Sequence, residues 1–532
     1  SVRAQLYPQW ELCLVDDASP HEHVRRVCEE YARLDSRIRF VRRQFNGHIS
    51  AATNTALDMA GGAFCALLDH DDELAPHALY MIAAELNDHP DTDMFFSDED
   101  KIDQQGVRYD PWFKSEWNYD LMLSQNAVVH LAVYRTSILR EIEGFRSGFD
   151  GSQDYDVTLR FSERTTPERI RHIPFILYHW RAIEGSVALA ETEKLYPYEA
   201  AQRAIQEHLN RTGRNATVTR QAHLGYYQVT WPVPDPAPKV SIIISVSDQP
   251  DRLGVLLSSI LRTTQYPNYE IVVVDNHDQE PSPLHHEGIA PLPNVRFLSY
   301  ENHCSFASAN NRATAQTDGP VLAFLNSDME VVEPGWLQEL VGHALRPEVG
   351  TVGAKLLSPD GKIEHAGIVM GIAELAGLCH LGESTETSGY FGRAACAQRY
   401  GAVTAACMVV RRDVFQYLGG FDETHFPTAL SDVDLGIRSY KVGLANVWTP
   451  HAKLLSHSPI SLARPGDLAR KAHFLQESSN FRRFWADIVE NDPHYNLNQT
   501  RSSGDFSPGF PPQVKRPWVP EKPAFQQNSS RN

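Results

Sequence analysis

A long internal repeat constrains this chain more than any other feature of its sequence. Residues 11–17 (ELCLVDD) return as residues 270–276 (EIVVVDN), and residues 66–71 (ALLDHD) return as residues 323–328 (AFLNSD). Self-similarity of this kind indicates that two parts of a chain fold alike. At 532 residues the chain is also too long for one ordinary hydrophobic core. The sequence therefore predicts two tandem units of one fold.

The later part of each copy repeats as well. Gly144-Phe145 returns as Gly420-Phe421, residues 153–160 (QDYDVTLR) return as residues 431–438 (SDVDLGIR), and His179 returns as His457. The separation is 257 residues for Asp71 and Asp328 but 278 residues for Asp154 and Asp432. The second copy therefore holds about 21 more residues in its middle.

Strand-like apolar runs alternate with amphipathic segments in both copies. The pattern predicts helices over residues 23–34, 50–59 and 253–261, and strands over residues 11–15, 38–41, 64–68 and 240–246. Such alternation is typical of βαβ units, so we expect an α/β fold with a mostly parallel sheet in each copy. The run at 64–68 has the apolar character of a buried parallel strand. Nothing in the first copy corresponds to the strand at 240–246, and we expect the first unit to lack its opening strand.

Composition sets the expected unit boundaries. We expect a first unit over residues 1–232, a proline-rich linker at 233–239 and a second unit over 240–490. Residues 491–532 are rich in Pro, Ser, Asn and Gln and have little periodicity, which predicts a disordered tail.

Charge and cysteine content narrow the functional classes. A net charge of −18 argues against a nucleic-acid-binding protein. The seven cysteines are scattered without a C-x-x-C pair, which favours reduced thiols and a cytoplasmic protein. No run approaches the ~18 apolar residues of a membrane-spanning helix. Peripheral association with the inner face of a membrane stays open, and the sequence does not predict an oligomeric state.

An acidic stretch follows the strand expected at 64–68. Residues 69–73 read DHDDE and stand where that strand would leave the sheet, which is where open α/β sheets bind ligands. Like charges this close repel one another, and a bound divalent cation would relieve the repulsion. A solvated acidic turn before the helix expected near Pro76 is the alternative.

Three polar features survive in both copies and in the same order. They are the carboxylates Asp71 and Asp328, the carboxylates Asp154 and Asp432, and the imidazoles His179 and His457. Carboxylate and imidazole ligands together suit Mn²⁺ or Mg²⁺. An aspartate too distant to be a ligand could act as a general base. Taken singly, the Asp154 side chain could instead cap a helix, and each histidine could be an ordinary half-buried side chain.

Both halves resemble glycosyltransferase family 2, whose members are inverting nucleotide-sugar transferases of the GT-A fold. The resemblance rests on ordered motifs in each copy: VDDAS (15–19), LLDHDDEL (67–74), GSQDYD (151–156) and LYHWR (177–181), then VVDNHD (273–278), FLNSDME (324–330), GGFDE (419–423) and SDVDLGIR (431–438). The residues of these motifs are similar to those of bacterial tandem transferases that build O-antigen or other surface polysaccharides, often with rhamnosyl-type activities. It implies a nucleotide-sugar donor and a saccharide or lipid-linked saccharide acceptor.

For the first copy, the resemblance implies a role for each matching residue. Asp16, Asp17 and Asp69 would contact the nucleoside, Asp71 would be the main metal carboxylate with His179 as an additional ligand, and Asp154 would be the base. Asn54 is also assigned to the nucleotide-sugar site. Asp72 has no aspartate counterpart, because Met329 stands there, and it receives no catalytic role.

For the second copy, the resemblance implies Asp275 at the nucleoside, Asp328 and His457 at the metal, and Asp432 as the base. Asn311 and Asn326 are assigned to the nucleotide-sugar site. Three departures weaken this second set: Asn326 replaces the first aspartate of the D-x-D motif, Asn276 and His277 replace an acidic-small pair, and His457-Ser458-Pro459 lacks a following acidic residue.

Two other functions stay open at this stage. One copy could be a degenerate scaffold or binding module, with only the other catalytic. A nucleotidyltransferase would also combine an α/β sheet with acidic metal sites. That class needs a Gly-rich basic loop near its start, and the second copy has none after Val246.

Overall fold

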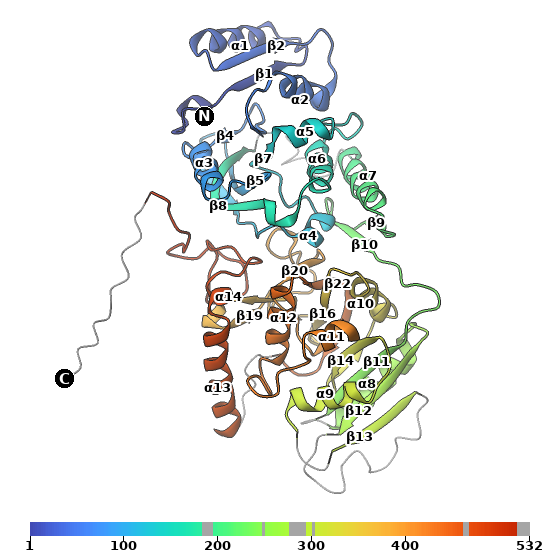
Figure 1. The fold of residues 1–532 in the computed structure, drawn as a ribbon. Helices are drawn as coiled ribbons and strands as arrows, with labels where there is room; N and C mark the ends of the chain where they lie inside the picture. The colour runs from blue at the N-terminus through green and yellow to red at the C-terminus, as the bar shows by residue number, and fades with distance from the viewer. Residues whose placement is uncertain (183–194, 247–249, 276–293, 301–303, 461–467, 519–532) are drawn as a thin grey trace, which may run out of the picture.

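The computed structural model describes residues 1–182, 195–246, 250–275, 294–300, 304–460 and 468–518. Two α/β units follow one another along the chain, one above the other in Figure 1. The predicted tandem α/β architecture is confirmed. Among the described residues, no helix combines the length and the apolar character that crossing a bilayer requires.

The second unit is built on one large sheet. Its strands follow the order β13-β12-β11-β14-β21-β16-β22-β15. The bounds are β11 (Val240–Val246), β12 (Tyr269–Asp275), β13 (Val295–Ser299), β14 (Val321–Asn326), β15 (Met329–Val331), β16 (Val349–Leu357), β21 (Cys407–Arg411) and β22 (Ala445–Ser456), with β17 (Ile363–His365) pairing with β16 and β20 (Gln398–Tyr400) pairing with β22. A separate small sheet joins β18 (Ile368–Met370) to β19 (Ala376–Leu378). The central strand β11 runs parallel to both of its neighbours, β12 and β14.

The first unit divides the corresponding strands between two sheets. A parallel pair joins β1 (Leu12–Asp16) to β2 (Ile38–Arg42). The second sheet has the order β3-β7-β5-β8-β4, with bounds β3 (Phe64–Ala66), β7 (Ala132–Arg135), β5 (Met94–Ile102), β8 (Ile170–Arg181) and β4 (Glu73–Leu74), and β6 (Arg108–Trp112) pairs with β5. In the described part of the chain, no strand stands between β1 and β3 as β11 stands between β12 and β14.

The prediction of a buried parallel strand at 64–68 is therefore wrong. The strand β3 covers three residues and pairs antiparallel with β7. Ala66 is exposed, whereas its counterpart Ala323 in β14 is buried. The physical reason is that β14 has β11 on its second edge, and β3 has no such neighbour among the described strands.

Helices cover the sheets of both units. In the first unit they are α1 (Glu22–Leu34), α2 (His48–Met59), α3 (Ala78–Asp88), α4 (Tyr119–Ser124), α5 (Thr136–Glu141), α6 (Gln153–Ser162) and α7 (Tyr196–Arg211), followed by a hairpin of β9 (Thr217–Arg220) and β10 (Tyr227–Thr230). In the second they are α8 (Pro250–Thr263), α9 (Phe306–Ala315), α10 (Trp336–Ala344), α11 (Arg412–Tyr417), α12 (Ser431–Lys441), α13 (Leu468–Phe484) and α14 (Ala486–Glu490). The expected helices at 23–34, 50–59 and 253–261 correspond to α1, α2 and α8.

A pair of hydrogen bonds explains why two asparagines recur. The Asn54 side chain donates to the Phe145 carbonyl (2.7 Å) and accepts from the Phe145 N–H (2.8 Å). Asn311 makes the same two bonds to Phe421, at 2.9 and 3.0 Å. Gly144 has φ of +64°, and a Cβ there would lie 2.4 Å from the Asn54 oxygen, so this turn requires glycine. These repeated residues belong to the framework of the fold.

The second aspartate of the D-x-D-x-x-x-R segment belongs to the same framework. The Arg160 guanidinium donates to Asp156 (2.9 Å) one helical turn away, and also to the Gly144 carbonyl. In the second unit, Arg438 donates to Asp434 at 2.8 Å in the same i,i+4 arrangement. This ion pair joins the second aspartate of each segment to the arginine. Only the first aspartate is left for chemistry.

The two units meet through α4. The Asp120 carboxylate is buried and accepts hydrogen bonds from Arg346 and from Arg399 (2.7 Å), both in the second unit. Trp112 of the first unit stacks on Phe391 of the second, with ring centroids 4.9 Å apart. Figure 1 shows α4 facing the loops around β20 at this junction.

The prediction of a disordered tail from residue 491 is wrong for residues 491–518. This segment leaves α14 and returns to the junction of the two units (Figure 1). Asn496 and Asn498 are buried there, and both donate hydrogen bonds to Asp98 of the first unit. Composition predicted disorder because the segment is polar, but its amides are buried against a carboxylate. Residues 519–532 lie outside the described residues.

Candidate functional site

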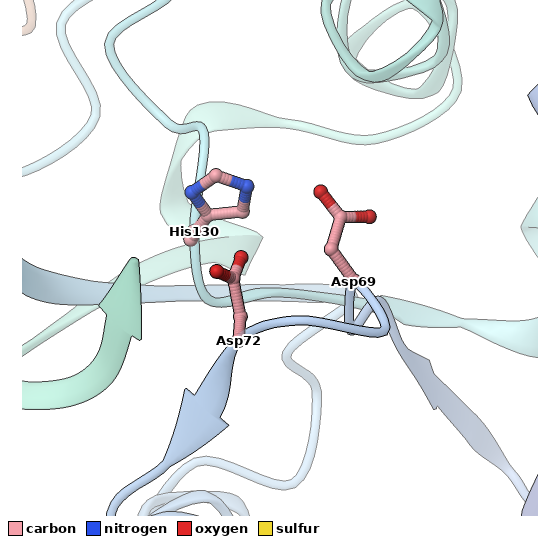
Figure 2. Close-up of side chains that lie close together, drawn as sticks. All are labelled: Asp69, Asp72 and His130. Carbon is pink, nitrogen blue, oxygen red and sulfur yellow. The ribbon is translucent and has the colours of Figure 1, made fainter. Parts of the chain in front are cut away.

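Three side chains from two loops converge in the first unit. Asp69 lies in the turn after β3, Asp72 directly precedes β4, and His130 lies two residues before β7. One ligand atom from each lies within 4.8 Å of the others. Figure 2 shows the two carboxylates and the imidazole side by side. Two carboxylate oxygens and an imidazole nitrogen are a fitting donor set for Mn²⁺.

Asp72 is the buried carboxylate of this cluster. Its Oδ1 accepts a hydrogen bond from the Arg181 N–H at 2.7 Å, and its Oδ2 accepts one from the Tyr178 hydroxyl. Burial raises the pKa of this carboxyl, and the two hydrogen bonds oppose the rise. The carboxylate is thus held in a fixed orientation.

His130 is oriented by a carboxylate behind it. Glu99 on β5 accepts a hydrogen bond from the His130 backbone N–H at 3.1 Å, and the same oxygen lies 3.3 Å from the imidazole Nδ1. The imidazole stacks on the Tyr178 ring at 4.4 Å. Burial opposes the charged imidazole, but Glu99, Asp69 and Asp154 outweigh it and raise the pKa of His130.

Asp154 belongs to the same electrostatic group. It lies in the first turn of α6, and its Oδ2 accepts a hydrogen bond from the Asn126 side chain at 2.8 Å. Burial raises the pKa of Asp154, and the positive charge of His130 opposes the rise. A carboxylate that is half-buried, oriented and shifted upward in pKa has the properties of a general base.

Asp71 and His179, the expected metal ligands of the first unit, have other nearest partners. The Asp71 side chain is 30% exposed, and its nearest ion-pair partner is His70 at 3.8 Å. The His179 Nδ1 is 2.5 Å from Asp100. The only three-donor group of the described residues in this chain contains neither Asp71 nor His179.

In the second unit, Asp328 lies in the turn between β14 and β15, and Asp432 lies in the first turn of α12. Asp328 is buried, and its Oδ1 has no hydrogen-bond partner among the described residues. Such an orphaned oxygen fits a cation ligand. Asp432 accepts from the Ala405 N–H (2.9 Å) and from its neighbour Val433, and burial raises its pKa as it does for Asp154.

The other predicted residues of the second site lie close by. The His457 N–H donates to the Asp328 carbonyl (2.9 Å), but its imidazole bonds to Glu330 at 2.8 Å. Asn326 ends β14, where its N–H donates to the Ala406 carbonyl. Strand register places Ala406 where the first unit has His130. Asn276 and His277 lie outside the described residues.

The residues assigned to the nucleoside lie at the strand ends of each unit. Asp16 ends β1 and accepts from the Ser19 N–H (2.8 Å), with Arg42 at 3.2 Å. Asp17 is 2.8 Å from the Arg43 guanidinium. Asp275 ends β12 and is buried. Asn54 and Asn311, by contrast, bond to the backbone of Phe145 and Phe421, as described above.

Sequence reasoning missed His130 and gave Asp72 no role. Both lack a counterpart in the repeat, since Ala406 and Met329 stand at those positions. A search for repeated residues discards such positions. The position of His130 just before the strand that pairs with β3 was the available signal, because that register brings it to the end of β3.

Comparison with known proteins decides the family. The sequence model of glycosyl transferase family 2 matches residues 1–143 and 241–419, which is more than half of the chain and part of each unit. The chain belongs to glycosyl transferase family 2. The resemblance seen in the motifs is confirmed, this protein is a glycosyltransferase, and the nucleotidyltransferase alternative is wrong.

Three relatives place this glycosyltransferase among known proteins. The uncharacterized protein y4gI of Sinorhizobium fredii is 43% identical over 95% of this chain and 56% of that protein. The O-antigen biosynthesis protein RfbC of Myxococcus xanthus is 40% identical over 95% of this chain and 39% of that protein. The N-acetylglucosaminyl-diphospho-decaprenol L-rhamnosyltransferase of Mycobacterium tuberculosis is 28% identical over 43% of this chain and 78% of that protein. The chain thus spans little more than half, or less, of the first two relatives.

Proposed function

We propose that each unit transfers a sugar from a nucleotide-sugar donor to a saccharide acceptor, with inversion at the anomeric carbon, during synthesis of an O-antigen-like surface polysaccharide. One observation carries the proposal: Asp154 and Asp432 lie half-buried at matching helix starts, and each has a raised pKa. The names of two relatives support the polymer class and a lipid-linked acceptor. A cytoplasmic location, with contact to the membrane surface where such an acceptor resides, is part of the proposal.

The chemistry assigned to the chain is a single displacement. The carboxylate of Asp154 or Asp432 takes the proton of an acceptor hydroxyl, whose oxygen attacks the anomeric carbon opposite the diphosphate. The new carbon–oxygen bond forms as the bond to the diphosphate breaks, and the nucleoside diphosphate leaves. The Asn126 amide and the Ala405 N–H hold the two carboxylates in place for this step.

The residues present fit a divalent cation in each unit. We assign Asp69, Asp72 and His130 to Mn²⁺ or Mg²⁺ in the first unit, and Asp328, with its orphaned oxygen, in the second. A cation bound there supplies positive charge that offsets the charge of the leaving diphosphate. Asp71, His179 and His457 remain sequence-based candidates for this role.

A matched pair of variants tests which carboxylate binds the cation. In the full chain with Asp328→Asn, which silences the second unit, Asp72→Asn is expected to raise the Mn²⁺ dissociation constant at least about tenfold, because a ligand charge is lost. Asp71→Asn, on the adjacent half-buried side chain, is expected to change that constant less than about twofold. Titration calorimetry with Mn²⁺ measures both, and thermal unfolding checks that Asp72→Asn is folded. A large loss of Mn²⁺ affinity in Asp71→Asn, with no loss in Asp72→Asn, would reverse the assignment.

The transfer itself is tested with a panel of UDP-, dTDP- and GDP-sugars in the presence of Mn²⁺. Release of nucleoside diphosphate from at least one donor, enhanced by a saccharide acceptor, is the expected result. A chain that releases none, although Mn²⁺ binds, contradicts the proposed function.

A further inference from the structure

The segment after α14 reaches across the junction into the network behind His130. We infer that Asn496, near the far end of the chain, is a positioning residue for the first transfer site. It acts through Lys114 and Glu99 on the imidazole of His130. The inference rests on the proposed function, since it concerns a cation ligand of that site.

The first contact of the network is a buried carboxylate. Asp98 on β5 is fully buried. The Asn496 amide donates to both of its oxygens at 3.0 Å, the His172 Nε2 lies 2.7 Å from Oδ1, and the Asn498 amide donates to Oδ2 at 3.3 Å. A buried carboxylate is costly without such donors. Asn496 and Asn498 of the carboxyl-terminal segment therefore supply hydrogen-bond donors to a carboxylate buried in the first unit.

The second contact passes to Lys114. Its N–H donates to Asp98 at 2.9 Å, and its carbonyl accepts from Asn496 at 2.7 Å, so both backbone groups of Lys114 are fixed. Its ammonium group is buried and donates to the Val128 and His130 carbonyls, each at 2.5 Å. The position of Lys114 thus sets the position of the loop that carries His130.

The last contact orients the imidazole. The Lys114 ammonium lies 3.4 Å from Glu99, and the same Glu99 oxygen accepts from the His130 backbone N–H at 3.1 Å and lies 3.3 Å from the imidazole Nδ1. Partners behind a metal ligand fix its orientation and commonly change cation affinity by about 10–100-fold when removed. Asn496 lies at the outer end of such a set.

The test measures Mn²⁺ affinity of the full chain, with Asp328→Asn to silence the second unit. Asn496→Leu keeps the volume of the side chain but removes its amide, so Asp98 loses one of its donors and the Lys114 carbonyl loses the Asn496 donor. The expected result is a rise of about tenfold in the Mn²⁺ dissociation constant, measured by electron paramagnetic resonance of free Mn²⁺. Combined with Glu99→Gln, the rise should be smaller than the product of the two separate effects, because both act on His130.

Asn446→Leu is the matched control. Asn446 is also buried, and its amide donates to the carbonyls of Gly401 (2.9 Å) and Gly436 (2.8 Å) inside the second unit. Asn446→Leu removes a comparable set of hydrogen bonds at a place away from the first site. The Mn²⁺ dissociation constant of this variant should stay within about twofold of the parent value. If Asn496→Leu does not fold, Asn498→Leu, which removes the longer bond to Asp98, should still raise it about threefold.

Two results would overturn the inference. One is an Mn²⁺ affinity that Asn496→Leu leaves unchanged, and the other is an equal loss in Asn496→Leu and Asn446→Leu, which would mean a general loss of stability. Either leaves the proposed function intact. A parent chain that binds no Mn²⁺ at the first unit would instead overturn the proposed cation site, and the inference with it.

Discussion

Replacing Asp154 with asparagine is expected to lower the rate of sugar transfer by the first unit about 10²–10⁴-fold, and Asp432→Asn should do the same for the second unit. Each substitution keeps the shape of the side chain and removes the group that accepts the proton. Mn²⁺ affinity should stay within about threefold, because neither residue is a proposed ligand. Release of nucleoside diphosphate, measured for each variant with saturating donor, shows the loss.

The pH dependence of the same reaction has a definite sign. Burial raises the pKa of both carboxyls, and a base works only when ionised. The transfer rate should therefore rise with pH through a pKa above the ordinary value of about 4, and then level off. Wild-type turnover in the Asp154→Asn/Asp432→Asn double variant would remove both aspartates from the reaction.

Replacing Arg346 with methionine is expected to lower the free energy of unfolding by about 3 kcal/mol. Asp120 and Arg346 have side chains only 2% and 4% exposed, so the variant leaves a buried carboxylate with Arg399 as its remaining guanidinium partner. Urea unfolding followed by circular dichroism measures the loss. The transition should also become less cooperative, because this ion pair joins the two units.

An exposed ion pair serves as the control for Arg346. Arg164 lies 3.5 Å from Glu141, and both side chains are more than half exposed, so Arg164→Met should cost less than about 0.5 kcal/mol.

Burial opposes the charge of Asp120, but the two guanidinium groups outweigh it and lower its pKa. The stabilisation is therefore present above the unfolded pKa of about 4 and is lost as pH falls further. Equal effects of both variants at pH 7 would contradict the account of the junction.

The repeat predicted the fold well because the same backbone bonds recur in both copies. Asn54 and Asn311 recur for this reason, whereas the sequence analysis assigned them to the nucleotide-sugar site. A repeated polar residue can serve the framework as well as the chemistry, and only the hydrogen bonds of Phe145 and Phe421 distinguish the two.

The site was predicted in part. Asp154 and Asp432 recur and lie at matching half-buried positions, and both stay the candidate bases that the sequence predicts. His130 could not be found by recurrence, because the second unit has Ala406 there. The burial of the carboxyl-terminal segment was not predicted either. Asn496 interacts with a carboxylate nearly 400 positions earlier, and composition does not show such a contact.

The central claim is that both units are transfer sites, and the number of nucleoside diphosphates bound per chain tests it most directly. The Asp154→Asn/Asp432→Asn variant of the full chain is suited to the measurement because it binds without turnover. Equilibrium dialysis with Mn²⁺ and the nucleoside diphosphate of the active donor should give two molecules bound per chain, falling to one when Asp328→Asn or Asp72→Asn is added. A value of one before either substitution would mean that one unit is a scaffold, and a value of zero would contradict nucleotide-sugar transfer by this chain.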